Sequence, residues 1–278
     1  MNIPWKLKSA GFAAIDFFNA PRVLYFLQKN ITRRSRASAI DISPNWLRHS
    51  QHLEKHGATG LVLEFGAGKT LAQNLYLSNM VDRQLVVDLN RMIDVNLVEA
   101  ARRSLSKTMS MRSDCCIEGV ADLERYGIAY RAPFDVAESK LDDKSVDGCI
   151  STNTLEHVPR RDIVAIFDEV HRILKDDGIV SVKIDYTDHY AHTDRGISLL
   201  NYLRYDEQEW RTFNHRCHYQ NRLRHSDYIR IFEAAGFSTV EEYLGFSEVD
   251  VPDDIATSFQ GHDESWKATS GHLVLKKS

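Results

Sequence analysis

The sequence predicts an α/β fold: a doubly wound, mostly parallel seven-stranded sheet, preceded by a helical arm and carrying a cap of helices and loops. Short apolar runs, bounded by glycine or polar residues, alternate with segments whose apolar residues recur at helical spacing. Glycine-rich or acidic stretches follow several of these runs, as they do at the carboxyl ends of parallel strands. With 278 residues, 43% of them hydrophobic, the chain can bury such a core.

Residues 1–43 form a basic amphipathic arm. Residues 1–40 carry a charge of +6, which leaves −10 for the remainder of a chain whose net charge is −4. Such an arm can pack on the domain, join a second subunit in a homodimer, or lie on an anionic membrane surface. The acidic remainder argues against nucleic acid as a partner. Without a spanning run or a secretory signal, we expect a cytoplasmic protein, or one peripheral at the inner face of the membrane.

The main domain, residues 44–278, begins with a helix over 44–56, because Ser43 and Pro44 are typical of a helix start. The first strand is expected over 60–65 and the second over 84–88. A helix over 97–106 and strands over 128–132 and 146–151 follow. The apolar positions of 162–174 predict a helix that Gly178 ends. The last strands are expected over 179–186, 239–244 and 272–276.

The glycine turn after the first strand predicts a nucleoside site. Gly66 and Gly68 let the backbone approach a ligand closely, and Asp88, at the end of the second strand, can accept hydrogen bonds from ribose hydroxyls. A P-loop would need glycine where Leu63 stands, and a dinucleotide-binding turn needs a third glycine. Glu64 would repel pyrophosphate in either case. A cofactor without phosphate and with a cationic end therefore fits better.

These residues resemble class I S-adenosylmethionine-dependent methyltransferases of the small-molecule, type 11-like branch, and four later segments resemble successive motifs of that family. Together they cover roughly residues 60–185. The resemblance implies a Rossmann-like methyltransferase fold and S-adenosylmethionine as cofactor. Thr70 departs from the pattern, since many members carry a third glycine there. The four segments are Pro133 to Asp135, Leu141 to Ile150, Thr154 to Val158 and Ile173 to Gly178.

The resemblance also implies roles for single residues. Glu64 and the backbone of Gly66, Ala67 and Gly68 would hold the amino-acid end of the cofactor. Asp88 would bind the ribose with Leu89 beside it, and Asp135 would lie near the adenine. Asn153 would line the methyl-transfer site.

Residues 187–237 form the expected substrate cap, because a long insertion after a strand end usually closes a site. Their aromatic side chains could stack on sugar rings, while amides and guanidinium groups could bind hydroxyls or phosphate. Residues 188–192 and 219–228 resemble methyltransferases of bacterial surface-polysaccharide assembly. We therefore expect a small-molecule or glycan substrate.

Transfer to a hydroxyl requires a base, and neutral histidine suits cellular pH. Three histidines follow strands four and five: we rank His189 first, then His192, then His157. Asp185, Asp188 and Asp194 lie close to two of them in sequence and could join them around a metal ion or bind hydroxyls. Because no fixed ligand spacing is evident, we expect no metal.

The sequence thus predicts an O-methyltransferase acting on a sugar or similar polar molecule. An N- or C-methyltransferase of another metabolite is the alternative among enzymes, and a non-catalytic cofactor-binding scaffold is the alternative outside them. Intact glycines together with Glu64 and Asp88 argue against the scaffold.

Overall fold

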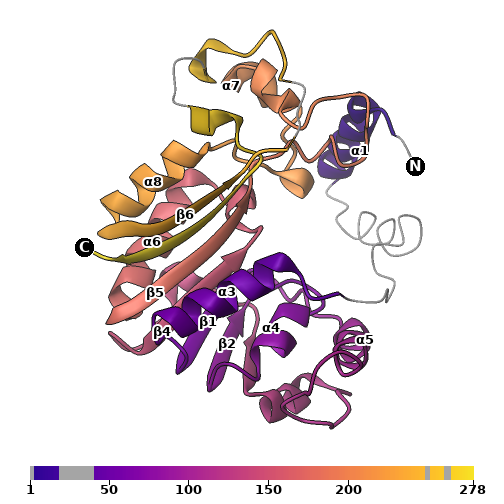
Figure 1. Cartoon of the computed structure of the whole chain (residues 1–278). Coiled ribbons are helices and arrows are strands. Elements are labelled where there is room, and N and C mark those ends of the chain that lie inside the picture. Colours follow the sequence, from indigo (N-terminus) through magenta and orange to yellow (C-terminus); the bar gives the residue numbers. More distant parts are fainter. Residues whose placement is uncertain (1–2, 19–40, 248–250, 260–263) are drawn as a thin grey trace.

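The computed structural model describes residues 3–18, 41–247, 251–259 and 264–278. Within them, seven strands form one sheet, and helices cover both of its faces (Figure 1). The strands are β1 (Leu61–Phe65), β2 (Arg83–Val87), β3 (Ile128–Arg131), β4 (Val146–Thr152), β5 (Leu174–Asp185), β6 (Phe237–Gly245) and β7 (Ser270–Lys277).

The strand order is β3-β2-β1-β4-β5-β7-β6. Every pairing from β3 to β5 is parallel, and β7 runs antiparallel between β5 and β6. The prediction of a mostly parallel seven-stranded sheet is therefore confirmed. The helices are α1 (Trp5–Phe17), α3 (Pro44–Lys55), α4 (Ala72–Leu77), α5 (Val95–Leu105), α6 (Arg160–Ile173), α7 (Glu207–Trp210) and α8 (His225–Ala234).

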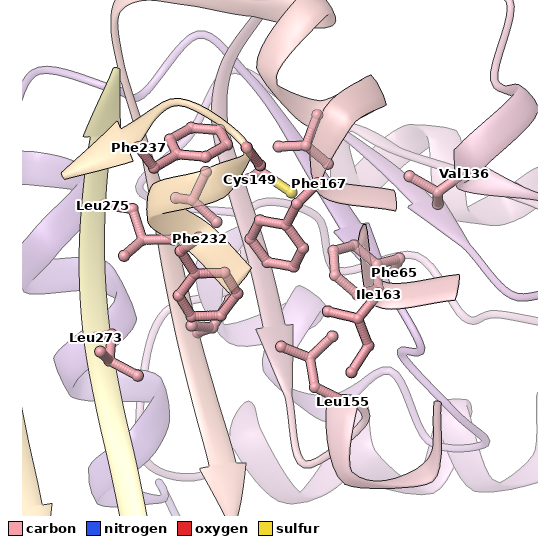
Figure 2. Close-up of a cluster of buried hydrophobic side chains, with 14 of the residues drawn as sticks. Phe65, Val136, Cys149, Leu155, Ile163, Phe167, Phe232, Phe237, Leu273 and Leu275 are labelled. Atoms are coloured by element: carbon pink, nitrogen blue, oxygen red, sulfur yellow. The ribbon is translucent and has the colours of Figure 1, made fainter. Parts of the chain in front are cut away.

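Two apolar cores hold the layers together. On one face of the sheet, α6 and α8 pack against β1, β4, β5 and β7; the rings of Phe167 and Phe232 lie 4.4 Å apart there (Figure 2). On the other face, α3, α4 and α5 bury Leu53, Leu75 and Val98. Since side chains alternate along a strand, β1 serves both cores, with Leu63 facing the first. Because β1 to β5 are parallel, their carboxyl ends lie together at one edge of the sheet.

The end of α6 differs from the prediction. The helix stops at Ile173, because the next residue is extended (φ −70°, ψ 139°) and already belongs to β5. Gly178, expected to end the helix, lies inside this strand. A Cβ there would come within 2.7 Å of the Asp147 carbonyl oxygen. The glycine is needed where the backbones of β4 and β5 approach closely and their register shifts.

Helix α1 packs on the cap (Figure 1). The Trp5 ring contacts Phe213 at 4.7 Å, and its backbone N–H donates to Asp194 at 2.8 Å. Residues 19–40, which hold most of the arm's basic side chains, lie outside the described residues. Membrane contact and dimerisation therefore stay predictions. Among the residues that the structure describes, no helix is both long and apolar enough to cross a membrane.

Candidate functional site

The loop after β1 turns at two glycines with positive φ, 76° at Gly66 and 75° at Gly68. A Cβ on Gly66 would lie 2.3 Å from the Thr154 side chain, whereas a Cβ on Gly68 would meet nothing within 4 Å. Gly66 is thus required by packing as well as by its φ. Gly68 is required by its φ alone, and the open space beside it can admit a ligand.

Glu64 lies beneath this loop and is almost fully buried, with 3% exposed. Its carboxylate accepts hydrogen bonds from the side-chain amides of Gln73 (2.9 Å) and Asn74 (2.6 Å). Burial raises the pKa of Glu64 to about 7, although the two amides oppose the shift. Glu64 therefore ties β1 to α4, and its predicted contact with the cofactor stays a prediction.

Asp88 follows β2 directly and is 4% exposed. Its Oδ1 accepts the backbone N–H of Gly68 at 3.3 Å, and its Oδ2 accepts the hydroxyl of Tyr130 at 2.8 Å. Burial raises the pKa of Asp88, and these hydrogen bonds oppose the shift. Each carboxylate oxygen retains a lone pair for a ligand hydroxyl. Tyr130, which lies in β3 opposite Val86 of β2, was not among the predicted site residues.

A cavity of about 270 Å³ opens between α6 and the ends of β1 and β2. Its walls are largely apolar; Leu89 lines it while 65% exposed, and His157 contributes a polar side. Small-molecule sites usually measure about 300–1,000 Å³, so this cavity suits one portion of a cofactor. Asp135 also lines it, and its carboxylate accepts the N–H of Ala137. Asn153 is exposed beyond the lining, with φ 50°.

The three predicted histidines come together beyond this cavity. The ring centroids of His157 and His189 lie 4.8 Å apart, and those of His189 and His192 lie 5.0 Å apart. Asp185, the last residue of β5, places Oδ2 3.6 Å from His189 Nε2 and 3.9 Å from His192 Nε2. Burial raises the pKa of Asp185, but His189 and Thr187 outweigh burial and hold it at about 2. The cluster thus contains an ionised carboxylate.

Glu156 completes the cluster, although it was not among the predicted site residues. It is 2% exposed, and neither carboxylate oxygen has a hydrogen-bond partner among the described residues. Burial, aided by the charge of Asp185, raises the pKa of Glu156 to about 8; the nearby backbone N–H groups of Glu156 and Asp185 and the charge of Lys183 oppose the shift. A carboxyl group without partners in a protein interior is costly. The signal available in the sequence was its position beside His157.

Two other groups of residues serve the fold. His49 and His52 of α3 are buried, and both hydrogen-bond the Ser181 hydroxyl at 2.9 Å. Burial lowers the pKa of His49 to about 3 and that of His52 to about 4. Asp188 accepts hydrogen bonds within the cap, and Asp194 accepts them from the cap and from α1. Their partners are Tyr190 N and Asn201 Nδ2 for Asp188, and Trp5 N and Gly196 N for Asp194.

The aromatic cap residues also differ from expectation. Residues predicted to stack on a sugar are buried instead in a core of the cap with Trp5. Tyr190 and Tyr202 are each 1% exposed and Trp210 2%. Arg222 donates to the backbone carbonyl of Tyr202 inside the same segment, and Arg224 donates to that of Tyr186, just before it. These side chains shape the cap, because apolar burial outweighs ligand contact for aromatic rings that can reach one another. Helix α8, the end of the cap segment, packs against α6 and β6.

The geometry suits a nucleoside cofactor with an amino-acid end. Open space lies over Gly68, Asp88 can accept hydroxyl donors, and the apolar cavity near Leu89 and Asp135 can hold a base. The aromatic and histidine-rich side of the site begins where this cavity ends, at His157. The structure therefore brings together most of the predicted cofactor residues and all three histidines.

Comparison with known proteins agrees with this fold. Residues 63–182 match the family model described as a methyltransferase domain. The structure of a Burkholderia thailandensis 1,6-didemethyltoxoflavin N1-methyltransferase, with 1,6-didemethyltoxoflavin and S-adenosylhomocysteine bound, covers 100% of this chain and 92% of its own at 14% identity and a TM-score of 0.50. For an S-adenosylmethionine-dependent methyltransferase from Clostridium acetobutylicum, the match covers 92% of this chain and 98% of the other, at 12% identity and a TM-score of 0.49. No curated protein matches the sequence.

Proposed function

We propose that this chain, an enzyme with a methyltransferase domain over residues 63–182, uses S-adenosylmethionine to methylate a hydroxyl group of a sugar or similar polar molecule. The methyl-transfer chemistry rests on the domain match. The acceptor class rests on the polar cluster at the ends of β4 and β5, and on the resemblance of the cap to enzymes of polysaccharide assembly. We expect a free, nucleotide-linked or lipid-linked glycan as acceptor.

The cofactor would lie across the carboxyl ends of β1, β2 and β4. Asp88 would accept the ribose hydroxyls, and the apolar wall of Leu89 would cover one face of the adenine near Asp135. The amino-acid end would follow the backbone from Gly66 to Gly68, above the buried carboxyl group of Glu64. When bound, S-adenosylmethionine supplies an electrophilic methyl group on a sulfonium centre.

The histidine cluster would prepare the acceptor. His189 Nε2 is buried without a hydrogen-bond partner among the described residues and lies 3.6 Å from Asp185. A substrate hydroxyl placed there would pass its proton to His189 while its oxygen bonds to the methyl carbon and the carbon–sulfur bond breaks. Asp185 would stabilise the imidazolium that forms. Such a base contributes about 100- to 10,000-fold to rate.

The observation that carries this proposal is the position of His157. Its side chain lines the cofactor cavity, and its ring lies 4.8 Å from that of His189. The proton acceptor is therefore adjacent to the wall of the cavity proposed to hold the methyl donor. That proximity is what in-line transfer requires.

The test is calorimetric titration of the full chain with S-adenosylmethionine, S-adenosylhomocysteine and NAD. We expect micromolar binding of the first two alone. A transfer assay with isotopically labelled methyl donor then screens nucleotide sugars and glycans as acceptors, with amine-bearing metabolites in parallel. If neither S-adenosylmethionine nor S-adenosylhomocysteine binds, the enzyme assignment is contradicted. Labelling only of amines would replace O-methylation with N-methylation.

A further inference from the structure

The cluster beyond the cofactor cavity has the composition of a metal site. Glu156, His157 and His189 present ligand atoms that all lie within 4.8 Å of one another, and Asp185, His189 and His192 do the same. The two triads share His189. Ligands bound at about 2.1 Å to one ion in tetrahedral geometry lie about 3.4 Å apart, so the ligand atoms of either triad would have to approach one another by up to about 1.4 Å to hold an ion.

An independent observation points to a ligand at this place. Both oxygens of Glu156 and the Nε2 of His189 are buried and have no hydrogen-bond partner among the described residues. Glu156 is 98% buried, since its exposure is 2%. Buried polar atoms are normally satisfied, and each exception calls for a missing partner such as an ion or a water. A cation would satisfy the carboxylate and the imidazole together.

The second histidine cluster provides the contrast. His49, His52 and His272 converge as closely, but all three hydrogen-bond the hydroxyl of Ser181 at 2.9–3.0 Å. No carboxylate takes part in these bonds. Each of these three rings thus has a hydroxyl partner on one nitrogen, although Nδ1 of His272 is buried without a partner in the part of the chain that the structure describes. In the cluster beyond the cavity, by contrast, both oxygens of a buried carboxyl group are left without a partner among the described residues.

We propose that Glu156, His157, Asp185 and His189 bind one divalent metal ion, with His192 at the rim. Three imidazoles and two carboxylates favour Mn²⁺, Fe²⁺, Co²⁺ or Zn²⁺, while Mg²⁺ and Ca²⁺ prefer all-oxygen sites. The proposal departs from the expectation of no metal, which rested on ligand spacing along the chain. Glu156 and His157 join Asp185 and His189 only through the pairing of β4 with β5.

The surrounding hydrogen bonds suit ligation. The Nδ1 of His157 lies 2.9 Å from the carbonyl oxygen of Tyr219, which can only accept, so Nδ1 carries the proton and Nε2 is left with its lone pair. Metal-bound histidines usually have this arrangement. Thr187 donates to Oδ1 of Asp185 from both its backbone and its hydroxyl, which orients the carboxylate with Oδ2 toward His189.

The role of the ion rests on the proposed function. A bound cation would coordinate the acceptor hydroxyl and lower its pKa, as metal ions do for water. His189 would then be a ligand and no longer the base, and the proton would leave to solvent. Metal binding consequently decides between two ways in which the same cluster can activate a hydroxyl.

The experiment titrates Co²⁺ into the chelator-treated full chain, followed by calorimetry and by the visible spectrum of the ion. We expect one equivalent to bind, with absorption bands typical of nitrogen and oxygen ligation. Glu156→Gln and His189→Asn should each weaken binding at least tenfold. His56→Asn is the matched control, because His56 pairs with Glu241 and neither residue belongs to the cluster. We expect this variant to bind Co²⁺ as the wild type does.

S-adenosylhomocysteine is titrated into the same samples, so that the two proposals can fail separately. Absence of saturable Co²⁺ binding by a folded wild-type chain overturns the metal site, as does equal weakening by His56→Asn. If S-adenosylhomocysteine binds in that case, the methyltransferase assignment stands. If Co²⁺ binds and S-adenosylhomocysteine does not, the metal site stands and the proposed function fails. Circular dichroism of each variant confirms that it is folded.

Discussion

Replacement of Asp88 by asparagine should weaken cofactor binding about tenfold and leave the fold intact. The carboxylate is positioned by Gly68 and Tyr130 and would accept two ribose hydroxyls. A hydrogen bond to a charged group contributes about 1.5 kcal/mol at the lower end of its range. Asparagine keeps one acceptor oxygen and replaces the other with an amide donor, so about one such bond is lost, which corresponds to a roughly tenfold rise in Kd.

Calorimetry with S-adenosylhomocysteine measures this change, and thermal unfolding checks the fold. Burial raises the pKa of Asp88, which means that the ionised carboxylate costs folding free energy. Removing this charge should therefore change Tm little. Asp82→Asn is the control: it removes the same charge just before β2, at the other end of that strand, from an exposed residue. A Kd within threefold of wild type in a folded Asp88→Asn protein would refute the assignment of Asp88 to the ribose.

Three further outcomes are expected. Gly68→Ala should cost about 1–2 kcal/mol of unfolding free energy for its left-handed φ and also weaken S-adenosylhomocysteine binding, whereas Gly66→Ala should be more destabilising because its Cβ meets Thr154; denaturant unfolding and calorimetry separate the two effects. The raised pKa of Glu64 means that the folded state binds its proton more tightly, so its stabilising contribution is complete below pH 4.5 and disappears as pH rises through about 7. Glu64→Gln should therefore remove up to about 3 kcal/mol of the stability difference between pH 5 and pH 8 in urea titrations. Trp5→Ala removes a side chain that is 7% exposed, and should accelerate amide exchange across α1 without changing cofactor affinity; unchanged exchange would contradict docking of α1 on the cap.

The elements that the sequence predicted well are those set by local pattern. Apolar runs placed six strands within two residues at each end, whereas β5 begins five residues before its expected start. Ser43 caps α3 as expected, its hydroxyl accepting the N–H of Asn45. The glycine loop and Asp88 were also predictable, because parallel strands bring their carboxyl ends to one edge. His157 and His189 meet for the same reason, since they follow the neighbouring strands β4 and β5.

What the sequence could not predict depends on burial and long-range contact. In the sequence, Glu156 looks like an ordinary acidic residue at the start of a helix. Only the folded chain shows that its carboxylate is buried without a partner among the described residues. The cap aromatics have the composition of a sugar site, yet Tyr190 and Trp210 pack on Trp5, which lies almost 200 residues away from them. Gly178 has the position of a helix stop, but the approach of β4 requires it.

One strand connects the two histidine clusters, and its sequence contained the signal. Along β5, Val180, Val182 and Ile184 enter the core beside α6, so by alternation Ser181, Lys183 and Asp185 lie on the other face. A strand next to the middle of a sheet, where both faces are covered, is ordinarily apolar throughout. Here Ser181 binds the buried histidines, while Asp185, four residues further and at the open edge, faces His189. The alternation along residues 179–185 therefore marks a polar path that leads from the interior to the site, and the chemistry is expected where that path reaches the edge of the sheet.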